Sequence, residues 1–254
     1  MHVVAVLALS SLDFSSLAHA AKLTPKGIVD KAMARQLFRA KGAEMTIAMR
    51  LRNKAGETRE RQLFLRSRRD GRSRTMVRVL APPRLRGTAF LFLQRTDGDD
   101  QFMYMPALKI TRRIVGSSKN ASFLGSQFTY ADLEWSALEH AHYRQLGDRR
   151  LGKDDCYQLQ ATPQAKDSAY RRVVITVRKR DFSMLAVDFF DGHDKLLKVL
   201  EVRRIEQVGG LPMATRLKMR NVQNGEVSLL VMGNVKLRDD LGPELFTKEA
   251  LAGP

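Results

Sequence analysis

Residues 85–133 read LRGTAFLFLQRTDGDDQFMYMPALKITRRIVGSSKNASFLGSQFTYADL and carry the strongest structural signal in the chain. Short apolar runs alternate here with glycine-containing turns and a basic tract, and no catalytic motif lies between them. The run AFLFL at 89–93 is apolar at every position, which is typical of a strand buried on both faces. The stretch therefore indicates an apolar surface under a charged rim, suited to holding an apolar molecule.

The residues on either side alternate with the period of two that a half-buried antiparallel strand produces. Within residues 43–51 the odd positions are all apolar, while the even positions include Glu44, Thr46 and Arg50. Turn signals such as Asp70-Gly71 separate further strand candidates. These candidates are residues 57–67, 72–80, 89–93, 101–105, 143–146, 155–161, 170–178, 184–191, 195–207 and 211–222, and a last strand in which Val227, Leu229, Val231, Val235 and Leu237 share one face.

Helices are few. Residues 26–40 are the best helix candidate, since Thr24 can cap its start, Pro25 suits its first turn and Gly42 ends it. Residues 246–251 predict a short terminal helix. We expect about ten or eleven strands, spaced as in all-β proteins, and a sheet of that size curls. The predicted fold is mainly β with α: a curled antiparallel sheet forms an incomplete β-barrel, covered by an N-terminal helix and short helices.

Residues 1–20 predict a cleaved signal peptide, and residues 21–254 then form one domain. An apolar run extends from Val3 to Leu9, and Ala18-His19-Ala20 is an A-x-A-type cleavage site. The alternative is a buried N-terminal strand or helix. No other stretch approaches the ~20 apolar residues of a membrane span. The single cysteine excludes an internal disulfide.

The chain has 254 residues and a formal net charge of +17. Such a charge is typical of proteins that bind nucleic acid or an anionic membrane. Export argues against nucleic acid and predicts a periplasmic protein, whose basic surface would meet anionic lipid and lipopolysaccharide. The alternative is that the host proteome is simply rich in arginine.

Three stretches resemble the outer-membrane lipoprotein-sorting proteins, whose fold is that of the LolA/LolB lipoprotein carriers. The first is LRGTAFL at 85–91, and the second is YMPALK at 104–109, continuing to RRI at 112–114. The third is SFLGS at 122–126, continuing to Phe128, Tyr130, Asp132 and Leu133. The resemblance implies an unclosed β-barrel covered by helices, with an apolar cavity for acyl chains. It also implies a large inner-membrane exporter of the resistance-nodulation-division type and an outer-membrane acceptor as partners.

The candidate ligand-binding residues are apolar side chains of the predicted strands and of residues 85–133. Burying acyl chain is worth about 0.8 kcal/mol per CH₂ group, so an apolar concavity needs no polar chemistry to bind lipid. The alternative for each residue is ordinary core. The candidates are Met45, Ile47, Met49, Leu63, Leu65, Phe90, Phe92, Phe102, Tyr104, Phe123, Phe128, Trp135, Met213, Leu217, Met219 and Leu229.

The basic tract supplies the candidate rim. Lys109, Arg112 and Arg113 lie between two aromatic stretches, where they could meet phosphate head groups or an acidic partner. The alternative is a solvated strand face.

Little in the sequence indicates catalysis or a cofactor. His140 and His142 alternate on a predicted strand, but no Cys or acidic residue completes a metal site at recognisable spacing. Gly-Ser at 116–117 and at 125–126 does not match G-x-S-x-G, and no phosphate-binding loop or dinucleotide fingerprint is present. We therefore expect no enzyme activity, no metal and no cofactor.

Three functional hypotheses follow. The first is a monomeric periplasmic carrier or chaperone that binds the acyl chains of lipids or lipoproteins in an apolar cavity for transport to the outer membrane. The second is an accessory protein that docks on an exporter or the outer membrane and holds no cargo. The third is an enzyme acting on envelope lipid, for which the sequence offers no nucleophile–base pair.

Overall fold

The computed structural model describes residues 23–34, 41–96, 98–134 and 140–253. Its strands are β1 (Gly42–Arg52), β2 (Thr58–Asp70), β3 (Arg72–Ala81), β4 (Ala89–Leu93), β5 (Asp100–Met105), β6 (Ile110–Ile114), β7 (His142–Leu151), β8 (Asp154–Thr162), β9 (Arg172–Arg178), β10 (Met184–Phe190), β11 (Leu196–Val208), β12 (Leu211–Asn221) and β13 (Val227–Leu237). Its helices are α1 (Pro25–Ala34) and α3 (Lys248–Ala252), and its 3-10 turns are η2 (Pro83–Leu85), η3 (Gly116–Asn120), η4 (Ala131–Leu133) and η5 (Pro243–Phe246).

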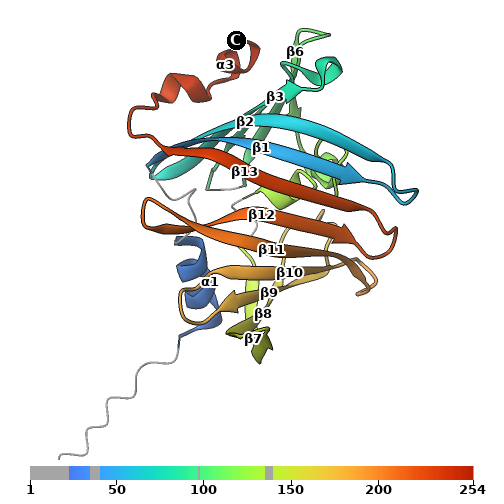
Figure 1. Cartoon of the computed structure of the whole chain (residues 1–254), viewed down its shortest axis with the longest axis vertical. Helices are drawn as coiled ribbons and strands as arrows, with labels where there is room; N and C mark the ends of the chain where they lie inside the picture. The colour runs from blue at the N-terminus through green and yellow to red at the C-terminus, as the bar shows by residue number, and fades with distance from the viewer. Residues whose placement is uncertain (1–22, 35–40, 97, 135–139, 254) are drawn as a thin grey trace, which may run out of the picture.

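Within these described residues the strands form one 13-stranded antiparallel sheet in the order β6-β5-β4-β3-β2-β1-β13-β12-β11-β10-β9-β8-β7 (Figure 1). Neighbours in the sheet are neighbours in the chain except at β1 and β13. The sheet curls but does not close, since β6 and β7 remain as its edges. The predicted fold class is confirmed. The strand count is higher than expected, and the basic tract ITRRI forms the edge strand β6.

The two faces of the sheet bury different apolar clusters. On β1 the buried odd positions belong to the larger cluster, inside the curl: Ala43, Met45, Ile47, Met49 and Leu51. A smaller cluster lies on the outer face, where Met76, Ala89, Leu91 and Phe102 pack under Leu241, Phe246 and Leu251. The predicted doubly buried strand is β4, because Phe90 and Phe92 belong to the inner cluster while Ala89 and Leu91 belong to the outer one.

Both predicted helices are present where the structure describes them. The hydroxyl of Thr24 accepts a hydrogen bond from Gly27 N at 3.1 Å, and α1 lies against β7 and β9 with Ile28 and Ala32 buried. The end of the predicted helix, 35–40, lies outside the described residues, as does the predicted signal peptide. The C-terminal pair η5 and α3 covers β3, β4 and β5 from outside. No helix in the described ranges is long and apolar enough to cross a membrane.

Candidate functional site: an apolar cavity inside the curled sheet

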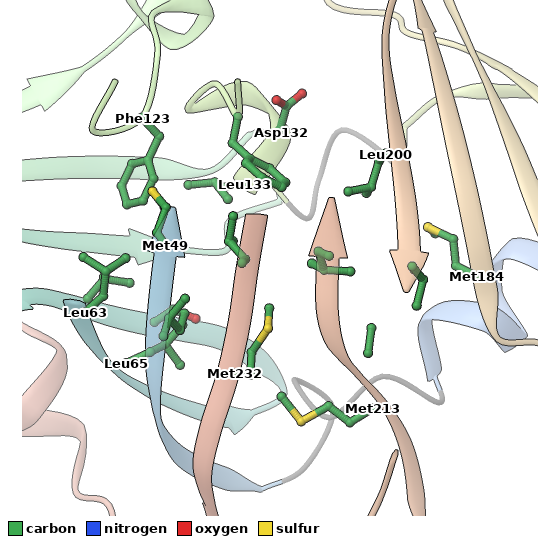
Figure 2. Close-up of a pocket in the computed structure, with 18 of the residues that line it drawn as sticks. Met49, Leu63, Leu65, Phe123, Asp132, Leu133, Met184, Leu200, Met213 and Met232 are labelled. Atoms are coloured by element: carbon green, nitrogen blue, oxygen red, sulfur yellow. The ribbon is translucent and has the colours of Figure 1, made fainter. Parts of the chain in front are cut away.

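A cavity of about 320 Å³ lies inside the curl (Figure 2). Its walls come from β1 to β4, from β10 to β13, from α1 and from the segment 123–134. Its apolar lining consists of Ala32, Ile47, Met49, Leu63, Leu65, Val77, Phe92, Phe123, Phe128, Leu133, Met184, Leu200, Val202, Ile205, Pro212, Met213, Ala214, Leu217, Leu230 and Met232. Its polar lining consists of Thr75, Asp132, Glu134 and Ser183.

Strand register explains why residues far apart in sequence meet here. Ile47 on β1 pairs with Leu63 on β2 and with Met232 on β13, so these side chains form one row across the inner face. Leu230 pairs in the same way with Met49 and with Leu217. The candidate residues that the structure places in the lining are Ile47, Met49, Leu63, Leu65, Phe92, Phe123, Phe128, Met213 and Leu217.

Several other candidates face inward but are sealed in the core beside the cavity. Met45, Phe90 and Met219 are fully buried members of the inner cluster and are absent from the lining. The Phe90 ring packs edge-on against Phe123, with 4.8 Å between the ring centroids. Phe90 therefore supports a lining residue from behind. Trp135 lies outside the described residues.

The prediction is wrong for Phe102, Tyr104 and Leu229, because their strands are apolar on both faces. On β5, Phe102 pairs with Leu91 and Tyr104 with Ala89, which places both rings in or against the outer cluster. The Lys248 ammonium lies 4.6 Å from the centroid of the Phe102 ring. On β13 the lining residues are Leu230 and Met232, so the odd-numbered Leu229 points outward.

The sequence analysis did not predict several lining residues of β10, β11 and the segment 123–134. Leu200 and Val202 lie on β11 at alternating positions, so its period of two could have identified them. Register shifts near Arg204 then change which positions face inward. A strict period of two therefore does not predict that Ile205 lines the cavity. Met184 and Leu133 come from a strand end and a 3-10 turn, where no period predicts the direction of a side chain.

The predicted rim residues do not line the cavity. Lys109 lies in the turn before β6, and Arg112 and Arg113 are exposed on that edge strand. Arg113 forms an ion pair with Asp100 on the neighbouring strand. Burial raises the pKa of the Asp100 carboxyl, but its hydrogen bonds with Arg95 and Arg113 outweigh burial and leave this pKa below its usual value.

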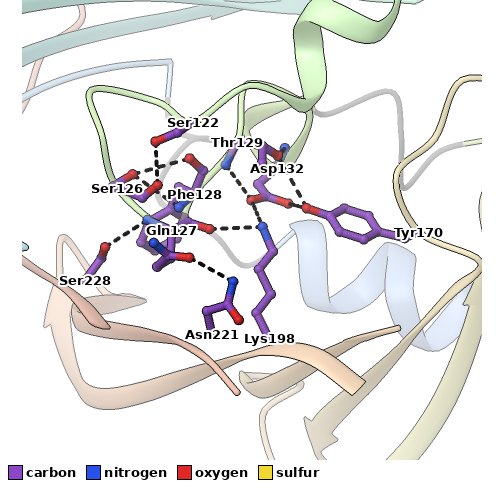
Figure 3. A network of polar contacts seen from close by, with 10 residues as sticks. All are labelled: Ser122, Ser126, Gln127, Phe128, Thr129, Asp132, Tyr170, Lys198, Asn221 and Ser228. Atoms are coloured by element: carbon purple, nitrogen blue, oxygen red, sulfur yellow. Dashed lines mark hydrogen bonds and ion pairs between the residues drawn. The ribbon is translucent and has the colours of Figure 1, made fainter. Parts of the chain in front are cut away.

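A buried ion pair lies at one end of the cavity, where the segment 123–134 forms the wall (Figure 3). Lys198 Nζ on β11 lies 2.5 Å from Asp132 Oδ2, and the two side chains are only 3% and 4% exposed. Asp132 also accepts hydrogen bonds from the Tyr170 hydroxyl at 2.8 Å and from Thr129 N at 2.7 Å. Burial lowers the pKa of Lys198, and the Asp132 carboxylate opposes that shift. Burial raises the pKa of Tyr170, and the nearby Asp132 charge adds to this effect.

Further hydrogen bonds tie the same segment to the sheet (Figure 3). Lys198 Nζ donates to the carbonyl of Gln127 at 3.0 Å. Gln127 N donates to the Ser228 hydroxyl at 2.9 Å, and the Asn221 amide donates to Gln127 Oε1 at 3.1 Å. The segment that carries Phe123, Phe128 and Leu133 is therefore fixed to β11, β12 and β13, and it closes this part of the cavity.

The second carboxyl group of the lining is Glu134. Burial raises its pKa, and the Lys119 ammonium at 2.5 Å opposes that shift. Asp132 and Glu134 both pair with lysines whose side chains are absent from the lining, and none of the described lining residues is cationic. Within the described ranges no group of three or more His, Cys, Asp or Glu side chains could hold a metal ion. The geometry suits the binding of an apolar chain.

The chain matches one family model and several solved structures. A family model described as "-like: Uncharacterized protein" matches residues 71–253. No curated protein matches the chain. Among solved structures, a domain from Vibrio parahaemolyticus described as an outer membrane lipoprotein-sorting protein domain is 29% identical, with a TM-score of 0.84 over 90% of this chain and 98% of that chain.

Two further structures support the same grouping. A DUF1329 family protein from Desulfovibrio piger is 26% identical, with a TM-score of 0.82 over 89% of this chain and 98% of that chain. A LolA superfamily protein from Nitrosomonas europaea is 23% identical, with a TM-score of 0.73 over 90% and 100% of the two chains, which indicates a shared fold. The chain therefore belongs to the family that the matching model defines, and it is similar to the outer membrane lipoprotein-sorting protein domain, with which it shares a LolA-like fold.

Proposed function

We propose that this protein is a periplasmic carrier or chaperone that binds the acyl chain of a lipid or lipoprotein and acts without catalysis. The observation that carries the proposal is the apolar cavity inside the curled sheet. Its volume of about 320 Å³ lies at the lower end of the roughly 300–1,000 Å³ that small-molecule sites span, which suits a single chain. Each CH₂ group buried there would contribute about 0.8 kcal/mol.

The lining also suits cargo of variable shape. Met49, Met184, Met213 and Met232 all reach the cavity, and the unbranched methionine side chain adapts to different apolar partners (Figure 2). Among the lining residues that the structure describes, none is a cation that could neutralise an anionic head group inside. We therefore infer that the cavity recognises the hydrocarbon chain and leaves the head group outside.

The proposed location rests on two observations. One is the A-x-A cleavage pattern at Ala18-His19-Ala20. The other is the likeness to a protein domain described as sorting outer membrane lipoproteins. The exporter and acceptor partners stay predictions. A docking role without cargo is not favoured, because the interior is open and apolar.

Native mass spectrometry of the purified protein tests this function, since we expect co-purified lipid. Ala214 lines the cavity on β12, so Ala214→Phe should fill the space and reduce the bound lipid severalfold. The matched control is Ala55→Phe in the exposed turn between β1 and β2, which should retain wild-type lipid content. A wild-type protein that carries no lipid and takes up no fluorescent fatty acid would overturn the proposal.

A further inference from the structure

The outer face of the sheet, opposite the cavity, carries a charged surface that the carrier function does not use. We call it the convex cationic face and define it by three strands. Arg50 and Arg52 lie on β1, Arg216, Lys218 and Arg220 lie on β12, and Val227, Leu229 and Val231 lie between them on β13. Successive side chains of a strand point to opposite faces. Since Met49, Leu217 and Leu230 line the cavity, their neighbours in sequence point away from it.

The strand register arranges these residues in rows. Leu229 pairs with Arg50 on one side and with Lys218 on the other. Val227 pairs in the same way with Arg52 and Arg220. Each of these half-buried apolar side chains therefore lies between two cationic side chains. The result is an apolar stripe flanked by two rows of positive charge.

Few acidic groups neutralise this face. Arg50 forms an exposed ion pair with Glu60 at 2.8 Å, and Glu201 lies opposite Lys218 in register. Within the described residues, Arg52, Arg216 and Arg220 form no hydrogen bond or ion pair with another side chain. The convex cationic face therefore has a local excess of positive charge that intramolecular contacts leave available.

No described helix covers this face. The C-terminal pair η5 and α3 packs over β3, β4 and β5 instead, and α1 lies on the inner side (Figure 1). In the view of Figure 1, β1, β13 and β12 cross the front of the molecule with nothing drawn over them. The surface is thus open to a large, flat partner.

We propose that the convex cationic face docks the protein on an anionic phospholipid surface. Guanidinium groups match phosphate oxygens in a bidentate geometry, and the long stems of Arg and Lys bury against apolar surface while their charges reach outward. The Val227–Leu229–Val231 stripe supplies the apolar contact beneath the head groups. Because this face lies opposite the cavity, the protein could rest on a membrane with its cavity unobstructed. The inference is independent of whether the cavity holds lipid.

Co-sedimentation with vesicles tests the docking surface. We expect the protein to bind vesicles of phosphatidylcholine mixed with phosphatidylglycerol and not to bind vesicles of phosphatidylcholine alone. The bound protein should dissociate as the salt concentration increases. Each cation near an anionic surface contributes roughly five-fold in partitioning, so Arg52→Gln/Arg220→Gln should weaken binding about 25-fold. Both residues are exposed, and a thermal melt should confirm that the variant folds like the wild type.

The matched control removes the same charge elsewhere. Arg149 and Arg150 are exposed on the edge strand β7, so Arg149→Gln/Arg150→Gln should bind vesicles almost like the wild type. Equal losses in the two double variants would mean that net charge alone drives binding, and would overturn the proposal. The proposal would also be overturned if the wild-type protein did not bind anionic vesicles, or if it bound neutral vesicles equally well.

Discussion

At the scale of single residues, the ion pair of Lys198 and Asp132 is almost completely removed from water. Removing two charges from water costs several kcal/mol for each ion, and only close pairing with further hydrogen bonds offsets this cost. Both conditions are met, since Asp132 accepts from Tyr170 and Thr129 while Lys198 donates to Gln127 O. The pair therefore joins the segment 123–134, which closes one end of the cavity, to strand β11.

Lys198→Met should lower the free energy of unfolding by about 3–5 kcal/mol, because it leaves a buried carboxylate without its cation. Urea denaturation measures this loss. The control is Arg203→Met, whose exposed ion pair with Glu201 should contribute less than about 1 kcal/mol. If Lys198→Met lowered the free energy of unfolding as little as the control does, the Asp132 carboxylate would have to be hydrated or paired with another group, and the prediction would be wrong.

At the scale of secondary-structure elements, α3 acts as a cover for the outer face of the sheet. Thr247 caps its start by accepting a hydrogen bond from Ala250 N, and Arg78 Nη2 on β3 donates to the Ala250 carbonyl at 3.1 Å. A helix this short has little stability by itself. Its place is set by the buried Leu251 side chain, which packs in the outer cluster beside Leu91 and Phe102.

Leu251→Ala should therefore cost about 2–5 kcal/mol of stability, as other fully buried leucines do. Because this cluster lies on the opposite face from the cavity, lipid content should not change. The control is Leu108→Ala, whose side chain is 61% exposed and should change stability little. Thermal melting and native mass spectrometry on the same samples check both expectations, and lipid lost from Leu251→Ala would mean that the two faces are coupled.

At the scale of the whole molecule, the cavity lies between two halves of one meandering sheet. The first half runs from β6 to β1 and the second from β13 to β7, and in the described part of the chain their strands pair with each other at β1 and β13. Facing walls of the cavity, such as Leu63 and Leu200, thus belong to different halves. A chain bound between them would contact both halves and stabilise the native arrangement of the sheet.

A saturating fatty acid should consequently raise the melting temperature of lipid-free protein. Binding to the folded state alone adds about 2.7 kcal/mol when the ligand is at 100 times its dissociation constant. Ala214→Phe, with the cavity filled, should show a much smaller shift, whereas Ala55→Phe should respond like the wild type. Differential scanning calorimetry with and without ligand measures the shift, and identical responses from all three proteins would place the ligand elsewhere.

The amino-acid sequence by itself determined the kind of fold and part of the cavity lining. On β1 the contrast between apolar odd positions and polar even positions leaves one orientation for Ile47 and Met49, and both line the cavity. The run AFLFL predicts a doubly covered strand for the same reason, since burial on both faces leaves no polar position. The alternation on β12 likewise separates Leu217 inside from Lys218 outside.

Only the tertiary structure decided the positions where this contrast is absent or where distant segments meet. Phe102, Tyr104 and Leu229 lie on strands with apolar side chains on both faces, so local alternation could not say which face is which. Lys198 and Asp132 are 66 positions apart, and their pairing depends on how the segment after β6 enters the curl. A local pattern reports whether a side chain is buried, but which cluster buries it depends on register and closure, which are properties of the assembled sheet.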